Sequence, residues 1–469
     1  MIAGAASILS DAIGYILIAV LSLTGILFCF KTKFVQFRMF KEACRLTLSN
    51  KKNTDAGKKQ ISSFQAFCVS LGCRVGVGNI TGVCLALLIG GPGAIFWMWL
   101  FAIIGSATSF VETTLGQIFK EKSADGIYVG GPAYNARNAL GRPKLGIILA
   151  VVAIACHGFC ISGTFGNTIV SSLSDAFNIP QLAGAILLII VLGIILFAGF
   201  RGVAKVSVWL VPLMAVAYLL LAFVTIAMNI SAVPEIFASI FAGAFDLSAG
   251  LGGLLGSTVL VGVQRGLFSN QAGDGAITML TSSADVSHPV KQGLMQSLGV
   301  FIDTLVICSA TAFMVMVFGN PAGTGFTVDT LLSGILGEGA LGAAAPYVIA
   351  AFILIFSFTS IIATTSIGEQ NLKFFTGKKL PMIILKCGLL CFVFVTSLQS
   401  FDIVWKINDC AIGLHTIANC VLLFLLGKYA IEALADYQKQ KKAGVKEPEF
   451  DPKCLSSKRG ITAWPRKKE

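Results

Sequence analysis

Residues 71–79 read LGCRVGVGN, and residues 262–275 read GVQRGLFSNQAGDG. Each stretch lies in an otherwise apolar segment and combines closely spaced glycines with an arginine and an asparagine. Glycine costs about 1 kcal/mol in a helix interior, and several glycines within one turn let the backbone unwind. An unwound turn in lipid leaves N–H and C=O groups without partners, so it persists only where something polar occupies it. The two stretches therefore predict two interrupted membrane helices around a polar site.

The whole chain has the composition of a polytopic membrane protein. Of its 469 residues, 55% are hydrophobic and only 12% are charged, and the mean hydropathy is +0.83. This composition excludes a water-soluble globule and a collagen-like or disordered chain. A backbone that is exposed to lipid must satisfy its own polar groups, so all crossings should be helices. Apolar runs of sufficient length predict eleven of them, near residues 12–30, 64–89, 94–119, 145–177, 182–200, 204–229, 249–284, 293–318, 343–372, 382–398 and 410–430.

The basic residues separate onto alternate loops of this arrangement. One set of loops and the C-terminal tail hold 31 of the 35 Lys and Arg residues, whereas the other set holds only Lys406. Because cytoplasmic loops are enriched in Lys and Arg, we expect the N-terminus outside and the C-terminus in the cytoplasm, in the cell inner (plasma) membrane. The net charge of +12 is explained by this topology. A lipid bilayer is therefore the expected partner, and nucleic acid is not.

The predicted spans fall into two sets. Spans two to six and seven to eleven have opposite orientations, and each set begins with an interrupted segment. Such pairs indicate a transporter binding site near the bilayer midplane. The N–H groups of a half-helix suit a carboxylate, and the free carbonyls suit a hard cation such as Na⁺. We expect an all-α protein with a 5+5 inverted repeat, divided into an N-terminal helix and basic cytoplasmic loop (1–63), a first five-helix repeat (64–230), a second five-helix repeat (248–430) and a cytoplasmic tail (431–469).

Acidic residues within predicted spans are the other costly feature. Glu112 and Glu369 lie near the expected cytoplasmic ends of their spans, where water or basic loop residues would meet them. Asp274 lies nine residues after Arg265, so an ion pair across the second break and a role in binding substrate both remain open. A dyad of Asp274 and Asp303 would suggest an intramembrane aspartyl protease. That enzyme and an ion channel are distant alternatives, and we do not expect an enzyme.

Hydroxyl side chains gather in the ninth predicted span, where residues 358–366 read FTSIIATTS. Such hydroxyls often bond to the carbonyl four residues earlier. Alternatively, Thr359 and Ser360 would replace part of the hydration shell of Na⁺. The 13 cysteines and three histidines show no metal-binding spacing, so we expect no cofactor besides a transported sodium ion. The Lys-rich and Pro-containing stretch 443–469 predicts a mobile extension.

Five motifs resemble hallmark stretches of the alanine/glycine:cation symporters, the sodium:alanine symporter family. They are RVGVGNI at 74–80, GGPGAIFWMW at 90–99, RGLFSN at 265–270, HPVKQG at 288–293 and DT at 303–304. The resemblance covers about residues 60–430. It implies a leucine-transporter-like fold with eleven helices, and uptake of small amino acids driven by Na⁺ or H⁺.

The resemblance also implies site residues. The amides of Gly76, Val77 and Gly78 would hold a substrate carboxylate. Na⁺ would be bound by two backbone carbonyls and two hydroxyls, those of Gly72, Val75, Thr359 and Ser360. The remaining expected substrate contacts are Asn79, Phe268, Asn270 and Thr364.

The sequence departs from the family pattern in and near the expected pocket. Gln271 stands where many members have Glu, and Asp274 where a neutral residue is usual. The Gln that is often found in the fourth span is replaced by Ile169 or Val170, and Thr364 falls where an aromatic residue or Asn is common. These differences affect substrate identity more than mechanism. We expect a sodium-coupled importer of alanine or glycine, with a proton-coupled or glutamine-selective symporter as the alternative.

Overall fold

The computed structural model describes residues 2–49, 61–197, 200–245, 254–319 and 321–464. Almost all of their regular structure is helical, with one short hairpin of β1 (Glu121–Lys122) and β2 (Tyr128–Val129). The longer helices are α1 (Ile2–Lys31), α3 (Phe40–Leu48), α4 (Ser63–Arg74), α5 (Val83–Gly90), α6 (Gly93–Ile118), α8 (Pro143–Ala153), α9 (Ser162–Phe177), α10 (Gln181–Leu196), α11 (Phe200–Met228), α12 (Val233–Ala244), α13 (Leu254–Asn270), α15 (Pro289–Val300), α16 (Ser309–Met316), α17 (Leu331–Glu338), α18 (Ala345–Leu372), α19 (Lys379–Ser397) and α20 (Phe401–Lys442). The shorter ones include α2 (Val35–Arg38), α7 (Pro132–Asn138) and α14 (Ala276–Thr281).

Eight helical segments of the described chain are long and apolar enough to cross a membrane, and a ninth span results if the bent pair of α4 and residues 78–90 is counted as one. Two further apolar helices, α10 and Ile230–Ala244, are shorter. The predicted helical membrane protein is thus confirmed. The eleven-span count, the inverted repeat and the division into 1–63, 64–230, 248–430 and 431–469 stay predictions.

The first interrupted helix follows the predicted stretch closely. A capping box of Ser62 and Gln65 starts α4, which ends at Arg74, and residues 75 and 76 leave the helical path. The chain then continues through a π-helix, η1 (Gly78–Gly82), into α5, and the two halves are bent by 48°. The break predicted around Gly76 is therefore present.

The second interruption is shorter than the predicted stretch. Helix α13 continues to Asn270, and only residues 271–275 are irregular before α14. Three of these five residues have positive φ: Gln271 (52°), Gly273 (96°) and Gly275 (84°). Positive φ is strained for a side chain such as that of Gln271, whereas glycine adopts it freely. The change of direction is thus concentrated in five residues.

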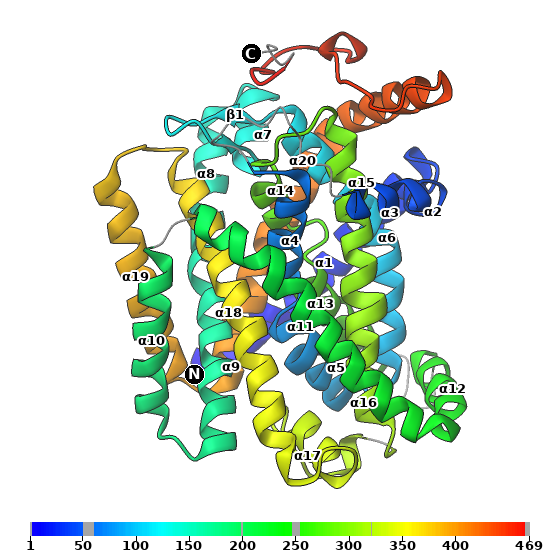
Figure 1. Cartoon of the computed structure of the whole chain (residues 1–469), viewed down its shortest axis with the longest axis vertical. Coiled ribbons are helices and arrows are strands. Elements are labelled where there is room, and N and C mark those ends of the chain that lie inside the picture. The colour runs from blue at the N-terminus through cyan, green and yellow to red at the C-terminus, as the bar shows by residue number, and fades with distance from the viewer. Residues whose placement is uncertain (1, 50–60, 198–199, 246–253, 320, 465–469) are drawn as a thin grey trace.

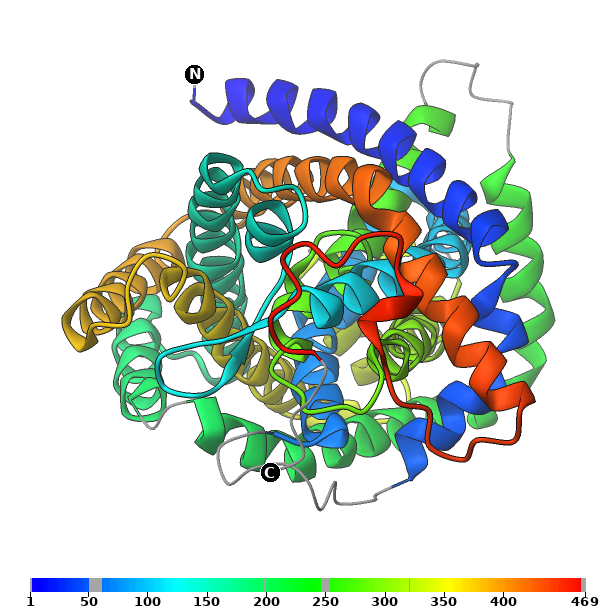
Figure 2. The same ribbon diagram turned by 90° about the horizontal axis from the view of Figure 1, so that it is seen from above.

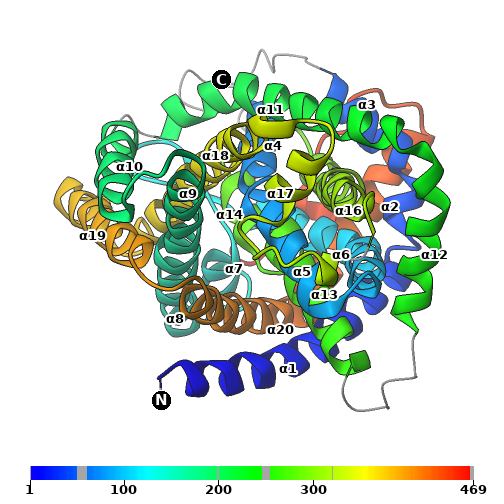
Figure 3. The ribbon, with the colours of Figure 1, turned by 90° about the horizontal axis from the view of Figure 1, so that it is seen from below.

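Both interrupted helices lie inside the bundle. In Figure 1, α4 and α13 lie between the pair α9 and α18 and the pair α6 and α15, while α10 and α19 form one outer edge. Figure 2 shows α1 along the outside of the bundle next to α20, and Figure 3 shows α5 near the middle from the opposite end. Two further π-helices, η2 (Ile154–Ile161) and η4 (Phe301–Cys308), interrupt otherwise continuous helices, and such bulges are frequent at functional sites.

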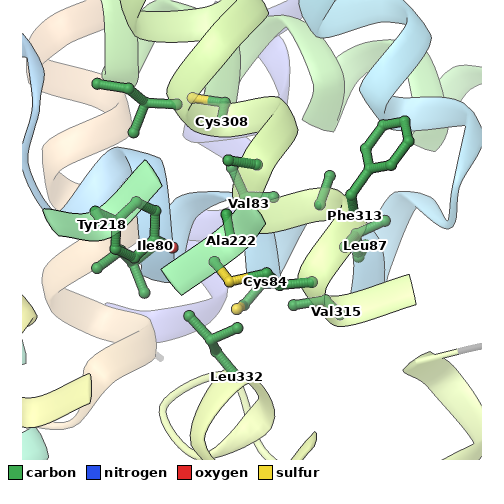
Figure 4. Packing of buried hydrophobic residues seen from close by; sticks show 14 of the residues in the cluster. Ile80, Val83, Cys84, Leu87, Tyr218, Ala222, Cys308, Phe313, Val315 and Leu332 are labelled. Atoms are coloured by element: carbon green, nitrogen blue, oxygen red, sulfur yellow. The ribbon is translucent and has the colours of Figure 1, made fainter. Parts of the chain in front are cut away.

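The half-helix after the first break is anchored by apolar packing. Ile80, Val83 and Leu87 are buried together with Tyr218 from α11 and Phe313 from α16 (Figure 4). Each large side chain that is fully buried contributes about 1.5–3 kcal/mol. This packing holds α5 and η1 in place although the helix before them is interrupted.

The expectation of a mobile C-terminal extension is wrong for the part of it that the structure describes. Residues 443–464 lie across the end of the bundle that is at the top of Figure 1. The Trp464 Nε1 donates to the Gln117 carbonyl at 3.0 Å, and the Phe450 amide donates to the Ser287 carbonyl at 3.0 Å. Phe450, Leu455 and Trp464 are buried, so a few spaced apolar anchors hold a segment whose average composition is polar.

Candidate functional site

The predicted cation ligands of α4 and α18 meet at the first break. The Ser360 Oγ lies 2.9 Å from the Gly72 carbonyl oxygen, and the Thr359 Oγ1 lies 3.4 Å from it. Both hydroxyls are also within 3.0 Å of the Phe356 carbonyl of their own helix. Val75, the fourth predicted ligand, follows the last residue of α4 and has an extended backbone with ψ of 91°. Three of the four predicted ligands are therefore in contact, and the fourth terminates the same helix.

Glycine allows this close approach. A Cβ atom at Gly76 would lie 2.5 Å from the Ser360 Oγ, and one at Gly78 would lie 2.9 Å from the Ser269 Cα. Real Cβ atoms do not come that close, so a side chain at Gly76 would displace the Ser360 hydroxyl, and one at Gly78 would push the first break away from α13. The second contact also places the first break directly against the end of α13.

Asn79 organises the break from within. Its Oδ1 accepts from the Gly76 amide at 2.8 Å, and its Nδ2 donates to the Asp303 Oδ1 at 2.7 Å. The Gly76 amide, expected to hold a substrate carboxylate, is therefore occupied in this structure. Among the described residues, the amides of Val77 and Gly78 donate to no backbone or side-chain acceptor. Two of the three predicted carboxylate donors thus remain available.

Asp303 connects this segment to the second interrupted helix. Its Oδ2 accepts from the Ser269 Oγ at 2.7 Å and from the Thr304 Oγ1 at 2.9 Å. The Thr304 Oγ1 in turn accepts from the Asn270 Nδ2 at 3.1 Å. Asn270 therefore lies in this network at the last turn of α13, connected to Asn79 through Thr304 and Asp303.

Arg74 joins both breaks to their surroundings. It is 1% exposed, and its Nε donates to the Asn270 carbonyl at 2.7 Å. Its Nη1 donates to the Gln296 Oε1 at 2.8 Å and its Nη2 to the Ser109 Oγ at 2.9 Å. The arginine thus caps the end of α13 while standing at the end of α4, and holds both to α15 and α6.

Aromatic rings cover the same region. Ring centroids of Phe268 and Phe165 are 5.9 Å apart, and those of Phe268 and Trp405 are 4.8 Å apart. The predicted contact Thr364 lies on α18, where its Oγ1 pairs with the Ser162 Oγ at 2.8 Å and lies 3.0 Å from the Ser360 carbonyl. Phe268 on α13 and Thr364 on α18 therefore lie on two different helices that flank the first break.

The suggested ion pair between Arg265 and Asp274 is wrong. Arg265 pairs with Asp409 on α20, and its guanidinium lies 5.0 Å from the centre of the Trp405 ring. Sequence reasoning missed Asp409 and Trp405 because it treated residues 399–409 as a loop, whereas α20 begins at Phe401. Their spacing of four residues, which puts them on one helix face, was a signal that could have found them.

The expectation for Glu112 is also wrong. This carboxylate is 1% exposed and accepts from the Gly275 amide and the Asn419 Nδ2, both at 3.1 Å. It therefore belongs to the second break and does not face a basic loop. Glu369 does meet a basic residue, since it pairs with Lys386 at 3.0 Å.

Two interrupted helices that meet around buried polar groups define a class of membrane transporter. The crystal structure of MhsT in complex with L-phenylalanine has the same fold, with a TM-score of 0.56 at 18% identity over 84% of this chain and 94% of that chain. The family model described as the sodium:alanine symporter family matches residues 2–452, and the chain belongs to that family. It is a transporter and not an enzyme, so the protease alternative is discarded.

Curated relatives agree with this assignment. The chain is 40% identical to the probable sodium/glutamine symporter GlnT of Bacillus subtilis, over 96% of this chain and 93% of that protein. It is 38% identical to the putative sodium/proton-dependent alanine carrier protein YrbD of Bacillus subtilis, over 96% and 94%. It is 32% identical to the sodium/alanine symporter AgcS of Methanococcus maripaludis, over 88% and 91%. The names of these relatives differ in substrate and in coupling ion.

Proposed function

We propose that this chain imports alanine or glycine together with sodium across the plasma membrane, with its N-terminus outside and its C-terminus in the cytoplasm. The observation that carries the proposal is the meeting of the Gly72 carbonyl with the Thr359 and Ser360 hydroxyls beside the first break. The sodium/alanine symporter AgcS among the relatives supports the same choice of substrate and ion.

The hydroxyl geometry supports a site for Na⁺. A hydroxyl has one proton and two lone pairs, and the Ser360 Oγ has two acceptors within reach, the carbonyls of Gly72 and Phe356. If the proton turns to Phe356, the Ser360 oxygen faces the Gly72 carbonyl oxygen without a proton between them. Thr359 has the same choice. Oxygen atoms arranged in this way suit a hard cation, and the Val75 carbonyl at the end of α4 would complete the set.

The substrate site would lie on the other side of the break. The α-carboxylate would accept from the Val77 and Gly78 amides, which begin the half-helix formed by η1 and α5 and carry its positive dipole end. Gly76 would line the same turn, and Asn79 would act by holding it in shape. Phe268, Asn270 and Thr364 would contact the remainder of the substrate.

Substrate size would be limited by the rings around the break. Phe165, Phe268 and Trp405 form continuous aromatic contacts, which would favour a small side chain. The alternative is glutamine, favoured by the 40% identity to a probable sodium/glutamine symporter. Polar groups of Asn270 and Thr364 would then meet the substrate amide.

Coupling would follow from the shared backbone. The cation site uses the end of α4, and the carboxylate site uses the turn that follows it. An ion that orders this turn reduces the entropy that the substrate must lose on binding, so each ligand raises the affinity for the other. Alternating access would rock the predicted spans two, three, seven and eight against the rest.

The test is uptake of labelled alanine, glycine and glutamine by the purified protein in proteoliposomes, with and without an inward sodium gradient. We expect gradient-dependent uptake of alanine and glycine and weak uptake of glutamine. Glutamine uptake above that of alanine would select the alternative substrate. Uptake of all three that does not depend on the gradient would refute sodium coupling.

A further inference from the structure

Four ionisable side chains gather where the second break meets the surrounding helices. Asp274 belongs to the break, Glu112 to α6, His157 to the π-helix η2 and His415 to α20. Each of them is 1% exposed or less. The His157 Nε2 lies 3.2 Å from the His415 Nδ1 and 3.9 Å from the Asp274 Oδ2. None of the four was needed for the sodium and substrate sites proposed above.

In each of the two carboxylates, only one oxygen atom accepts a hydrogen bond from the described residues. The Asp274 Oδ1 accepts from the Ala276 amide at 2.7 Å, and the Glu112 Oε2 accepts from the Gly275 amide and from Asn419. The second oxygen of each carboxylate, Asp274 Oδ2 and Glu112 Oε1, is buried without a hydrogen-bond partner. A buried carboxylate oxygen without a donor is costly, and a proton on it removes the charge that causes the cost.

The histidines have the same deficit. His157 Nδ1 and His415 Nε2 are buried without partners, while the 3.2 Å contact between the rings needs one proton to be a hydrogen bond. A neutral pair can supply that proton from either ring. One further proton, on the Asp274 carboxyl or on the imidazole of His157, would turn the 3.9 Å approach between these two groups into an attractive contact.

The local charge balance also requires protons. Arg74 is the cation that interacts electrostatically with Glu112, Asp274 and Asp303. One positive charge against three carboxylates leaves an excess of two negative charges in a buried region, if all three are ionised. Asp303 accepts three side-chain hydrogen bonds, from Asn79, Ser269 and Thr304, and these stabilise its ionised form. The excess therefore falls on the group formed by Glu112 and Asp274.

Other titratable groups do not correct this imbalance. The thiols facing the cluster come from α4, η2 and α20, and they can donate a hydrogen bond but carry no positive charge. The Cys420 Sγ donates to the Gly273 carbonyl and the Cys73 Sγ to the Gln271 Oε1, while Cys156 interacts electrostatically with Asp274. Among the described residues, no three His, Cys, Asp or Glu side chains are arranged to hold a metal ion, and a proton supplies both the missing hydrogen bond and the missing positive charge.

We propose that Glu112, Asp274, His157 and His415 form a proton-binding site at the second break, and that its proton moves with the amino acid and sodium. The transport part of this statement rests on the proposed function. The carboxylates bond directly to the amides of residues 275 and 276, so loss of the proton places unbalanced charge on the break itself. Arg74 holds the Asn270 carbonyl just before this break and stands next to Val75 of the first one, which joins the proton site to the substrate site.

The first experiment measures proton movement in proteoliposomes that contain a pH-sensitive dye. Adding alanine with an inward sodium gradient should acidify the lumen in the wild type, and alanine uptake should rise several-fold as the external pH falls. Asp274→Asn should remove the acidification and flatten this pH dependence, while Asp125→Asn, which alters an exposed partner of Lys373, should change neither. Acidification by Asp274→Asn at the wild-type rate, or a wild type that moves no protons, would overturn the proposal.

A second measurement does not depend on transport. Between about pH 7 and 8, free carboxyls are ionised and free imidazoles are mostly neutral, so the native wild type would hold a proton that the unfolded chain lacks. Raising the pH through this range should therefore lower the melting temperature of the purified protein, and should lower that of Asp274→Asn less. Equal slopes for the two proteins, with Glu112→Gln as a second variant, would overturn the proton site even if sodium-driven uptake is found. Unequal slopes without any uptake would leave the proton site standing and refute the proposed transport.

Discussion

Both breaks leave backbone polar groups without helical partners inside the bundle, but the side chains that meet these groups differ in chemistry. At the first, the Gly72 carbonyl and the Gly76 amide bond directly to neutral groups, namely the hydroxyls of Thr359 and Ser360 and the side-chain amide of Asn79. At the second, the amides of Gly275 and Ala276 bond to the carboxylates of Glu112 and Asp274, and His157, which contacts His415, lies beside Asp274. A neutral lining needs no counter-charge before a guest binds, and its dipoles stabilise the charge that the guest brings, whereas a charged lining must first be balanced. The first break is therefore suited to an ion and a zwitterion, and the second to a proton.

The largest expected effect is at the first break. Gly76→Val should abolish alanine uptake, because even a Cβ atom at this position would lie 2.5 Å from the Ser360 Oγ. The measurement is initial uptake normalised to the amount of reconstituted protein. Gly82→Ala is the matched control, since a Cβ there meets nothing closer than 3.9 Å and uptake should persist. Equal uptake by the two variants would show that the first break does not hold the substrate.

The next largest effect is expected at Arg74, which links the two breaks. Arg74→Gln should lower the free energy of unfolding by about 3–5 kcal/mol, because its side-chain donors to Asn270, Gln296 and Ser109 are lost in a buried region. Thermal unfolding in detergent checks this. Arg137→Gln, at a partly exposed pair with Glu121, should cost at most about 1 kcal/mol. If both substitutions cost the same, Arg74 does not unite the two regions.

A smaller effect is expected at the proposed cation site. Ser360→Ala and Thr359→Val should each raise the sodium concentration for half-maximal uptake, by about 5- to 30-fold if one ligand contributes about 1–2 kcal/mol. Ser366→Ala is the control, because this hydroxyl bonds to the Ile362 carbonyl of its own helix and should leave sodium dependence unaltered. An unchanged sodium requirement in the first two variants would place the ion elsewhere.

The smallest effect concerns a charged cluster away from both breaks. Burial acts to raise the pKa of Glu42, but hydrogen bonds from Arg45 and Tyr437 and the charges of Arg45 and Lys441 outweigh it, so the net pKa is lowered. A lowered pKa in the native state adds stability above the ordinary value of about 4.3, and this stability is lost as the pH falls through the lowered value. Glu42→Gln should remove about 0.5–1 kcal/mol at neutral pH and weaken the acid dependence of the melting temperature. Sodium-driven uptake should not change, and a change would mean that the breaks are not energetically separate from this cluster.

The interruptions were predictable because glycines and costly polar residues fall within one turn. The predicted position of the first break agrees with the structure, because Gly76 and Arg74 lie in the same short stretch. The second was predicted too broadly, because Gly262 serves a different purpose. A Cβ at Gly262 would lie 2.7 Å from the Ala94 carbonyl, so this glycine lets α13 pack on α6.

Long-range pairs were hard to predict from local spacing. Arg265 pairs with Asp409, 144 residues away, and His157 contacts His415, 258 residues away. The four-residue spacing of Trp405 and Asp409 was the local signal for the first pair, whereas the histidine pair has none, and the nearer Asp274 was an obvious but wrong partner for Arg265. The fold of the C-terminal segment was missed for a similar reason, because Phe450 and Trp464 are single apolar residues in a polar stretch. Site roles for the first break remain predictions that rest on the geometry described above.

The most direct test of the central claim is equilibrium binding of labelled alanine to the purified wild type in detergent, measured over a range of sodium concentrations. If one break holds the ion and the amino acid together, the apparent affinity for alanine should rise steeply with sodium and then level off once the ion site is filled. Ser360→Ala should need more sodium to reach the same plateau. Alanine binding of equal affinity with and without sodium would contradict the account.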